Sequence, residues 1–317
     1  MTIVTPYLAA ANNGNWHTAA RWARFLRPRY DVVVEKAWSG APCDLLIALH
    51  ALRSADSIGR FATAHPDRPL VVVLTGTDLY GDLGLGAPGH ASLQLATKLI
   101  VLNEHGPRRL PPSVRGKAEI ILQSARPLSA APKPARHLAV AVVGHLREAK
   151  NPQLVWAMLR QLPADLPLRV RHVGAALDPA LGREAARLAA SDTRYRWLGG
   201  LPRTQTRQIV RKSHLLLHPS HMEGGAQAVI EALTAHTAVL ASRVDGNTGL
   251  LGDDYPGLFA ATDAMAAGAA VARAAREPEY LRRLQTACEL RAPMFIPERE
   301  QAALLALVDR QLAAAGA

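Results

Sequence analysis

The sequence predicts an α/β protein built of two doubly wound, parallel-sheet (Rossmann-like) domains that face each other across a cleft. Short apolar runs alternate with helical patterns, the alternation stops at a proline-rich segment, and it then restarts. A chain of 317 residues is long enough for two domains of about 150 residues each. With 49% hydrophobic and 20% charged residues, it can bury a core and is not expected to be disordered.

In the first half, apolar runs predict strands at 3–5, 32–34, 44–49, 70–74, 99–102 and 120–122. Apolar residues at helical spacing predict a helix that includes Trp16 and Trp22 in its core face and stops at Pro28. Residues 126–137 contain three prolines and no periodic pattern. We therefore expect a linker there, between one domain over 1–128 and another over 136–317.

In the second half, strands are expected at 138–143, 168–173, 195–198, 215–217 and 239–241. A helix is expected to begin near Pro152, and others to cover 260–276 and 298–315, the last able to pack back on the first domain. Ligands of such sheets lie outside the carboxyl ends of the strands. The residues that follow each strand are therefore the candidates for function.

Charge and cysteine content narrow the function classes. The net charge of +11 favours an anionic partner, but 5% aromatic residues and the lack of a nucleic-acid-binding motif argue against nucleic acid. Cys43 and Cys288 are too far apart for a disulfide scaffold or a cysteine-rich zinc module. The N-terminus lacks the pattern of a secretory signal, and no apolar run reaches the roughly 20 residues of a membrane span. We expect a soluble cytoplasmic protein with no membrane partner.

The strongest motif is Glu223-Gly224-Gly225 with Glu231 eight residues after the first carboxylate. It follows a predicted strand, so the glycines are expected to open a helix whose free amides suit a phosphate. Eight helical residues span about 12 Å, a plausible reach from a hexose to a ribose across a diphosphate, and carboxylates bind sugar hydroxyls. The alternative is that Glu223 only caps the helix and Glu231 lies on a solvated face.

A second motif follows the strand at 138–143. His145, Arg147 and Lys150 place a histidine and two cations where a diphosphate leaving group needs its charge neutralised. The alternative is an ordinary polar turn.

The first domain offers candidates for binding a small anion. Backbone amides of Asn13, Gly14 and Asn15, between the first strand and its helix, can cradle an oxyanion, or Asn15 can simply be the N-cap of that helix. His17 in the first helical turn is either a ligand or a structural histidine.

The next two strands of the first domain are also followed by polar residues. Arg53 suits bidentate phosphate contact or a surface ion pair, and His50 precedes it directly after the strand. Thr75, Thr77 and Asp78 either line the cleft or form a turn.

Four motifs between residues 140 and 250 carry a family resemblance. They are Gly144-x-Leu146…Lys150, Trp197-Leu198-Gly199-Gly200, Pro219-Ser220-x-x-Glu223-Gly224-Gly225…Glu231-Ala232 and Val239-Leu240-Ala241-Ser242. In this order they resemble the donor domain of the GT-B retaining glycosyltransferases of the family 4 type.

That resemblance implies a role for each matched residue. Lys150 would bind the donor diphosphate, and Glu223 would hold the transferred sugar. Gly224 and Gly225 would face the phosphates, Glu231 would bind the ribose, and the backbone near Leu198 would contact the base. Ser220 falls in the same donor-binding motif. Where the family usually has an arginine after the first glycine, this chain has His145, so Arg147 is a candidate to compensate or His145 does different work.

A narrower resemblance covers most of the chain. The blocks that carry it are 12–19, 49–55, 73–80, 145–147 and 250–257. They are similar to the selenosugar synthases of selenoneine biosynthesis, which implies joining of selenophosphate to the sugar of a UDP-sugar, UDP-N-acetylglucosamine being the expected donor, with formation of a C–Se bond. The acceptor side would then use Asn13, Gly14, Asn15, His17, His50, Arg53, Thr75 and Thr77, and the catalytic set would be Glu223, Lys150, Arg147 and His145.

No DxD-like motif is evident, so we expect no cofactor and no metal requirement. Two other functions stay open: a family 4-type glycosyltransferase with a conventional sugar or lipid acceptor, and a non-catalytic binder of sugar nucleotides or nucleic acid. The sequence leaves the oligomeric state open.

Overall fold

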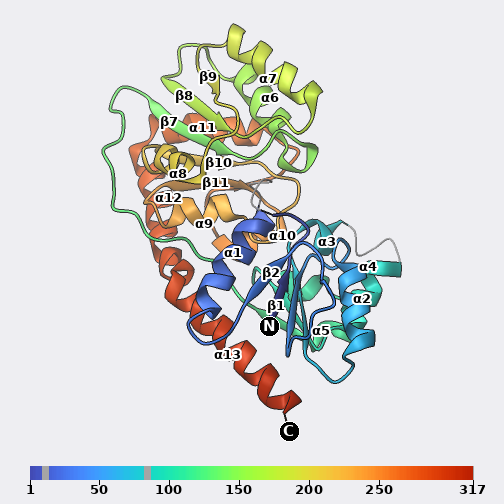
Figure 1. The fold of residues 1–317 in the computed structure, drawn as a ribbon. Coiled ribbons are helices and arrows are strands. Elements are labelled where there is room, and N and C mark those ends of the chain that lie inside the picture. Colours follow the sequence, from blue (N-terminus) through green and yellow to red (C-terminus); the bar gives the residue numbers. More distant parts are fainter. Residues whose placement is uncertain (9–13, 82–86, 317) are drawn as a thin grey trace. The chain divides into compact units, whose positions relative to one another are not determined.

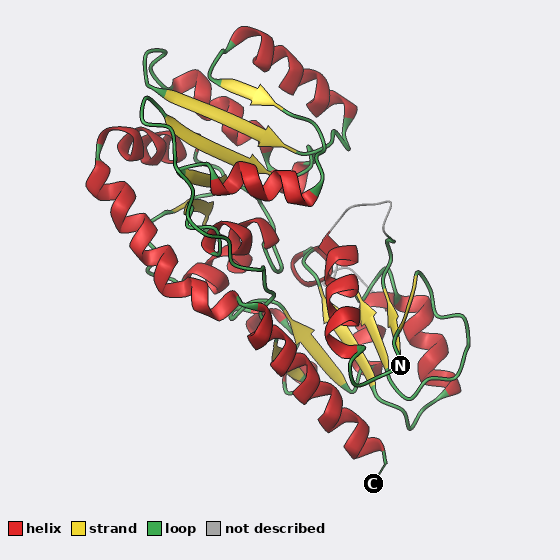
Figure 2. Cartoon of the chain, turned by 60° about the vertical axis from the view of Figure 1, so that its left-hand side comes forward, coloured by secondary structure: helices red, strands yellow, loops and turns green. Residues whose placement is uncertain are grey.

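The computed structural model describes residues 1–8, 14–81 and 87–316. The chain folds into two compact units (Figure 1). The first contains Met1–Gln123, Glu223–Gly225 and Pro297–Ala317, and the second contains Ser124–Met222 and Ala226–Ile296. Each unit is a parallel sheet with helices on both of its faces (Figure 2).

The first unit has a six-stranded sheet in the order β2-β1-β3-β4-β5-β6. Its strands are β1 (Thr2–Val4), β2 (Val33–Glu35), β3 (Leu46–Leu49), β4 (Leu70–Leu74), β5 (Lys98–Val101) and β6 (Ala118–Ile120), and all neighbours pair in parallel. Its α-helices are α1 (Gly14–Leu26), α2 (Ala55–Ala64), α3 (Thr77–Tyr80), α4 (Ala87–Leu95), α5 (Pro112–Arg115) and α13 (Pro297–Ala315). Every residue of β3 and β4 is buried, as expected for central strands covered on both faces.

The last helix is held to the first helix by a buried polar contact. Glu300 on α13 accepts hydrogen bonds from the Arg21 guanidinium at 2.8 and 3.0 Å and from Trp22 Nε1 at 2.7 Å, both on α1. Removing one partner of such a buried pair leaves an uncompensated charge. The contact therefore fixes the C-terminal helix within the first unit.

The second unit repeats the architecture with the strand order β12-β11-β10-β7-β8-β9. Its strands are β7 (Leu138–Val143), β8 (Leu168–Val173), β9 (Tyr195–Trp197), β10 (Leu215–His218), β11 (Ala238–Ser242) and β12 (Leu258–Phe259), again all parallel. Its α-helices are α6 (Pro152–Gln161), α7 (Pro179–Ser191), α8 (Arg203–Arg211), α9 (Gln227–Leu233), α10 (Asp245–Leu251), α11 (Ala264–Arg276) and α12 (Pro278–Arg291).

The proline-rich segment 126–137 has no helix or strand, and it runs along the second unit. Leu128 N–H donates to Thr234 O at 2.8 Å, and Lys133 Nζ donates to His236 O at 2.7 Å. Arg211 at the end of α8 donates to Ser129 O at 2.7 Å. The segment is therefore anchored at several points.

Within the described residues, no helix is long and apolar enough to cross a membrane.

Candidate functional site

In the first unit, one buried carboxylate organises the loops that follow β3 and β4. Asp78 Oδ1 accepts hydrogen bonds from the backbone N–H groups of Thr75 and Gly76, both at 2.8 Å. Its Oδ2 accepts from Ala51 N–H at 3.0 Å. Asp78 is fully buried, so it shapes these loops and does not itself line an open site, whereas Thr75 and Thr77 are half-buried.

His50, directly after β3, has a left-handed backbone with φ of 74°. This region is uncommon for residues other than glycine, and strain of about 1–3 kcal/mol there needs fixed surroundings. Its Nδ1 accepts from Arg53 N–H at 3.3 Å, and its Nε2 lies 3.0 Å from Thr77 Oγ1. Two predicted acceptor residues, His50 and Thr77, are thus in direct contact.

The segment Glu223–Gly225 is seated on the loops of the first unit. Asn103, just after β5, donates from Nδ2 to Gly224 O at 2.7 Å. A Cβ on Gly224 would lie 2.5 Å from Thr75 O. The segment therefore brings Glu223 to the part of the first unit that contains Thr75, Thr77 and His50.

Close packing explains both glycines of this motif. A Cβ on Gly225 would lie 2.5 Å from Gln123 Oε1 and 3.0 Å from Leu102 Cβ, so the buried Gln123 side chain would have to shift. Gly76 packs against the same segment from the other loop. Its φ is 141°, and a Cβ there would lie 3.1 Å from Gly224 N. The sequence interpretation assigned Gly224 and Gly225 to phosphates only, and it missed this requirement of the backbone.

The other predicted acceptor residues lie at the same edge of the first sheet. Arg53 is exposed, and its guanidinium carbon lies 5.3 Å from the ring centre of Tyr7, which follows β1. Gly14 begins α1 and its carbonyl accepts from Thr18 Oγ1 at 2.9 Å. Asn15 lies inside the first helical turn, so its alternative role as N-cap is wrong.

His17 is half-buried in that same turn of α1. Asn13 lies outside the described residues.

In the second unit, the loops after β7 and β8 touch backbone to backbone. A Cβ on Gly174 would lie 1.9 Å from Gly144 O, so only glycine fits there. The Lys150 side chain passes over Gly144, with Cγ 3.3 Å from where a Cβ would be. Arg147 is exposed at the start of the short 3₁₀ turn Glu148–Lys150. The two predicted cations therefore lie at the carboxyl end of β7.

Two histidines support these loops. His145 Nδ1 accepts from Ala175 N–H at 3.1 Å, so His145 joins the loop after β7 to the loop after β8. His172 on β8 is fully buried, and its Nε2 is 3.3 Å from Gly144 O. Burial lowers the pKa of His172 to about 4, and the bond to Gly144 opposes the shift only in part. His172 is therefore neutral near pH 7.

Leu198 and Ser220 follow β9 and β10. Leu198 N–H donates to His172 O at 2.8 Å, which leaves Leu198 half-buried at the edge of the loops. Ser220 is buried and its Oγ is 3.4 Å from His218 Nε2. Asn151, in a left-handed conformation after Lys150, donates to Pro219 O at 3.0 Å. These bonds place the loops after β7 and β10 beside each other.

Glu231 lies on α9, is buried, and accepts from Arg203 Nε at 2.6 Å. Arg207, one turn further along α8, also interacts electrostatically with the Glu231 carboxylate. That interaction raises the pKa of Arg207, but burial lowers it by more. The alternative that Glu231 lies on a solvated face is therefore wrong. Sequence reasoning missed both arginines, since they occupy a helix and do not follow a strand.

The motif does not form the continuous helix that the sequence predicts. Helix α9 begins at Gln227, after both glycines, with Ala226 as its N-cap. Glu223 therefore does not cap it, and the roughly 12 Å helical reach from Glu223 to Glu231 does not apply. In the part of the chain that the structure describes, no group of three or more His, Cys, Asp or Glu side chains could hold a metal ion.

Comparisons with known proteins agree with this architecture. The family described as "Glycosyl transferases group 1" matches residues 129–290. The structure of HepE from Anabaena in complex with UDP and glucose is similar with a TM-score of 0.76 at 14% identity, over 98% of this chain and 100% of that one. The sucrose-phosphate synthase of Thermosynechococcus elongatus has a TM-score of 0.79 at 15% identity, over 99% of both chains.

A third similar structure is the pneumococcal O-GlcNAc transferase GtfA in complex with UDP and GlcNAc. Its TM-score is 0.68 at 14% identity, over 84% of this chain and 57% of that one. The predicted GT-B fold is thereby confirmed.

Proposed function

Because the chain belongs to the glycosyl transferases of group 1, which match slightly more than half of it, we propose that this glycosyltransferase uses a UDP-sugar as donor and selenophosphate as acceptor. The expected donor is UDP-N-acetylglucosamine, and the product is a selenosugar with a C–Se bond, as in selenoneine biosynthesis. HepE, crystallised with UDP and glucose, and GtfA, with UDP and GlcNAc, support a UDP-sugar as donor.

The donor part of the proposal uses the carboxyl ends of the strands in the second unit. Lys150, over Gly144, and Arg147 would offset the negative charge that grows on the leaving diphosphate. Glu231, held by Arg203, would accept from ribose hydroxyls, and the backbone near Leu198 would meet the base. Because the ion pair with Arg203 already orders the Glu231 side chain, binding of the nucleotide costs little further side-chain entropy at this residue.

The acceptor part rests on one observation. His50 and Thr77 are in contact in the first unit, Arg53 lies three residues beyond His50, and Glu223–Gly225 is seated on the adjoining loop. An imidazole N–H, hydroxyls and a guanidinium are donors for a small oxyanion. They suit selenophosphate better than an apolar acceptor such as a lipid.

In the reaction, the selenium of selenophosphate attacks the anomeric carbon and forms the C–Se bond. The bond from that carbon to the diphosphate oxygen breaks, and UDP leaves with the electron pair. Glu223 would orient the sugar as positive charge develops on its ring. The selenium is already ionised, so no strong general base is needed; loss of the phosphoryl group to give a selenol is a later step.

The test is UDP release from UDP-N-acetylglucosamine with selenophosphate, compared with thiophosphate, phosphate, a sugar acceptor and water. We expect release that depends on selenophosphate, and a product with the selenium isotope pattern in mass spectrometry. Arg53→Ala should raise the KM for selenophosphate at least about tenfold, by loss of a charged hydrogen-bond donor, while exposed Arg60→Ala in the same unit should not. UDP release that ignores selenophosphate and responds to a sugar acceptor would overturn the proposal.

A further inference from the structure

The second unit contains a cavity at the amino end of its strands, opposite the loops that follow β7 and β8. Its volume is about 330 Å³, and it is lined by the linker, by β7 and β8 and by the end of α8. Small-molecule pockets measure about 300–1,000 Å³, and one water needs only roughly 10–15 Å³. The cavity can therefore hold a ligand of several atoms.

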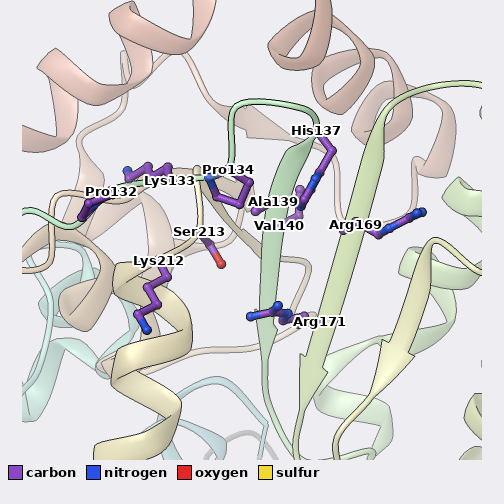
Figure 3. Close-up of a pocket in the computed structure, with 10 residues that line it drawn as sticks. All are labelled: Pro132, Lys133, Pro134, His137, Ala139, Val140, Arg169, Arg171, Lys212 and Ser213. Atoms are coloured by element: carbon purple, nitrogen blue, oxygen red, sulfur yellow. The ribbon is translucent and has the colours of Figure 1, made fainter.

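Basic side chains dominate this cavity. Figure 3 shows Lys133 and His137 of the linker near the start of β7, Arg169 and Arg171 extending from β8, and Lys212 at the end of α8. None of the ten lining residues is acidic. The nearby carboxylates Asp192 and Glu289 act on Arg169 and Lys133 from outside the lining, and Asp192 is already bound bidentately by Arg194.

The alternation of side chains along β8 places Arg169 and Arg171 on the same face of that strand. Leu168, Val170 and His172 are buried, whereas Arg169 and Arg171 are exposed and lie on the opposite face of the strand. In register, Arg171 pairs with Ala141 on β7 and with Arg196 on β9. The small Ala139 of β7 lines the cavity, and the exposed Arg196 adds a further positive charge on the edge strand.

Two of these cationic side chains, Lys133 and His137, act on the neighbouring His214. The imidazole of His214 accepts from Ala139 N–H at 3.0 Å at the edge of the cavity. Burial lowers its pKa, and the positive charges of Lys133 and His137 lower it further. The pKa of Lys133 is also lowered, mainly by burial. The positive charge of the linker therefore lies close to the start of β7, beside His214.

We propose that this cavity binds a small ligand with two or more phosphate groups, at a site separate from the donor site. Lys133, Arg169, Arg171 and Lys212 bring four basic side chains to the lining, so a ligand with more than one negative charge suits it. Arginine forks and lysine ammonium groups are the usual partners of phosphate oxygens. The apolar wall made by Pro132, Pro134 and Val140 can in addition contact a carbon framework.

The probe is inorganic pyrophosphate, titrated calorimetrically into the full-length protein with saturating UDP present to occupy the donor site. We expect saturable binding that weakens at least about tenfold in Arg171→Ala and in Lys212→Ala, since each removes a charged donor. Arg187→Ala, which removes an exposed arginine of α7 on the other face of the sheet, should bind as the wild type does. Circular dichroism of each variant checks the fold.

Two results would overturn the proposal. One is the lack of saturable pyrophosphate binding in the presence of UDP, and the other is equal weakening by Arg187→Ala, which indicates unspecific charge attraction. The proposal does not depend on the glycosyl acceptor: if UDP itself fails to bind, the comparison of Arg171→Ala with Arg187→Ala still decides it.

Discussion

Asp78 in the first unit and Glu231 in the second are both buried carboxylates beside predicted sites, but they are held in different ways. Three backbone N–H groups from two loops bind Asp78, whereas the side chain of Arg203 binds Glu231. A carboxylate bound by backbone fixes the shape of its loops. A carboxylate bound by a side chain can remain a ligand group, because the arginine balances its charge without enclosing it.

The largest expected effect is that of Asp78→Asn. The amide side chain loses the negative charge and turns an NH₂ toward one of the backbone N–H groups that Asp78 accepts from. Hydrogen bonds to charged groups contribute about 1.5–3 kcal/mol, so we expect the free energy of unfolding to fall by about 3 kcal/mol in urea denaturation. The matched control is Asp56→Asn, which removes an exposed carboxylate paired with Arg60 in the first turn of α2 and should change stability by less than about 0.5 kcal/mol.

In the second unit a buried histidine, His172, anchors the loop that follows β7. We therefore expect the stability of the protein to depend on this histidine when the pH is lowered. The folded pKa of His172 is about 4, below the unfolded value of 6.5, so the unfolded chain takes up a proton that the folded chain refuses. Stability is therefore present above pH 6.5 and is lost as the pH falls toward 4. Between pH 7 and 4.5, the wild type should lose about 2–3 kcal/mol more than His172→Gln in urea unfolding. Equal losses in both proteins would contradict the anchor role.

Gly224→Ala tests whether the motif segment depends on the loop that Asp78 shapes. The added Cβ meets Thr75 O at 2.5 Å, and overpacking of this kind costs about 1–3 kcal/mol. We expect a loss of about 2 kcal/mol in stability and, because Glu223 is the neighbour, a fall in kcat. Gly59→Ala on α2, where a Cβ meets nothing within 4 Å, should be neutral or stabilising. A Gly224→Ala protein with normal stability and activity would refute this packing account.

The sequence predicted the strands well where apolar residues formed a continuous or alternating run. Leu70–Leu74, Leu138–Val143 and Leu168–Val173 are β4, β7 and β8 as expected. The two-residue strand β12 was missed, because a run of that length carries no periodic signal. The placement of His50, Thr77 and Lys150 at strand ends followed from the same rule that ligand-binding residues succeed parallel strands.

Other features of the site depend on contacts between distant segments. That Gly224 packs on Thr75 and Asn103, more than a hundred residues earlier, cannot be deduced from a local pattern. Asn103 and Gln123 do follow predicted strands, so the strand-end rule could have singled them out. Arg203 lies on a helix, and nothing in its own segment indicates Glu231 as its partner.

Arg203→Gln gives the smallest and most specific test of the comparison. Arg203 is about one-third exposed and Glu231 nearly buried, so we expect a stability loss of about 1 kcal/mol. If the arginine holds Glu231 ready for ribose hydroxyls, calorimetry should show UDP binding weakened about fivefold. Arg282→Gln, in an exposed pair with Glu279, should change neither. Unchanged or tighter UDP binding in Arg203→Gln would mean that Arg203 competes for the carboxylate, and that Glu231, like Asp78, serves the fold.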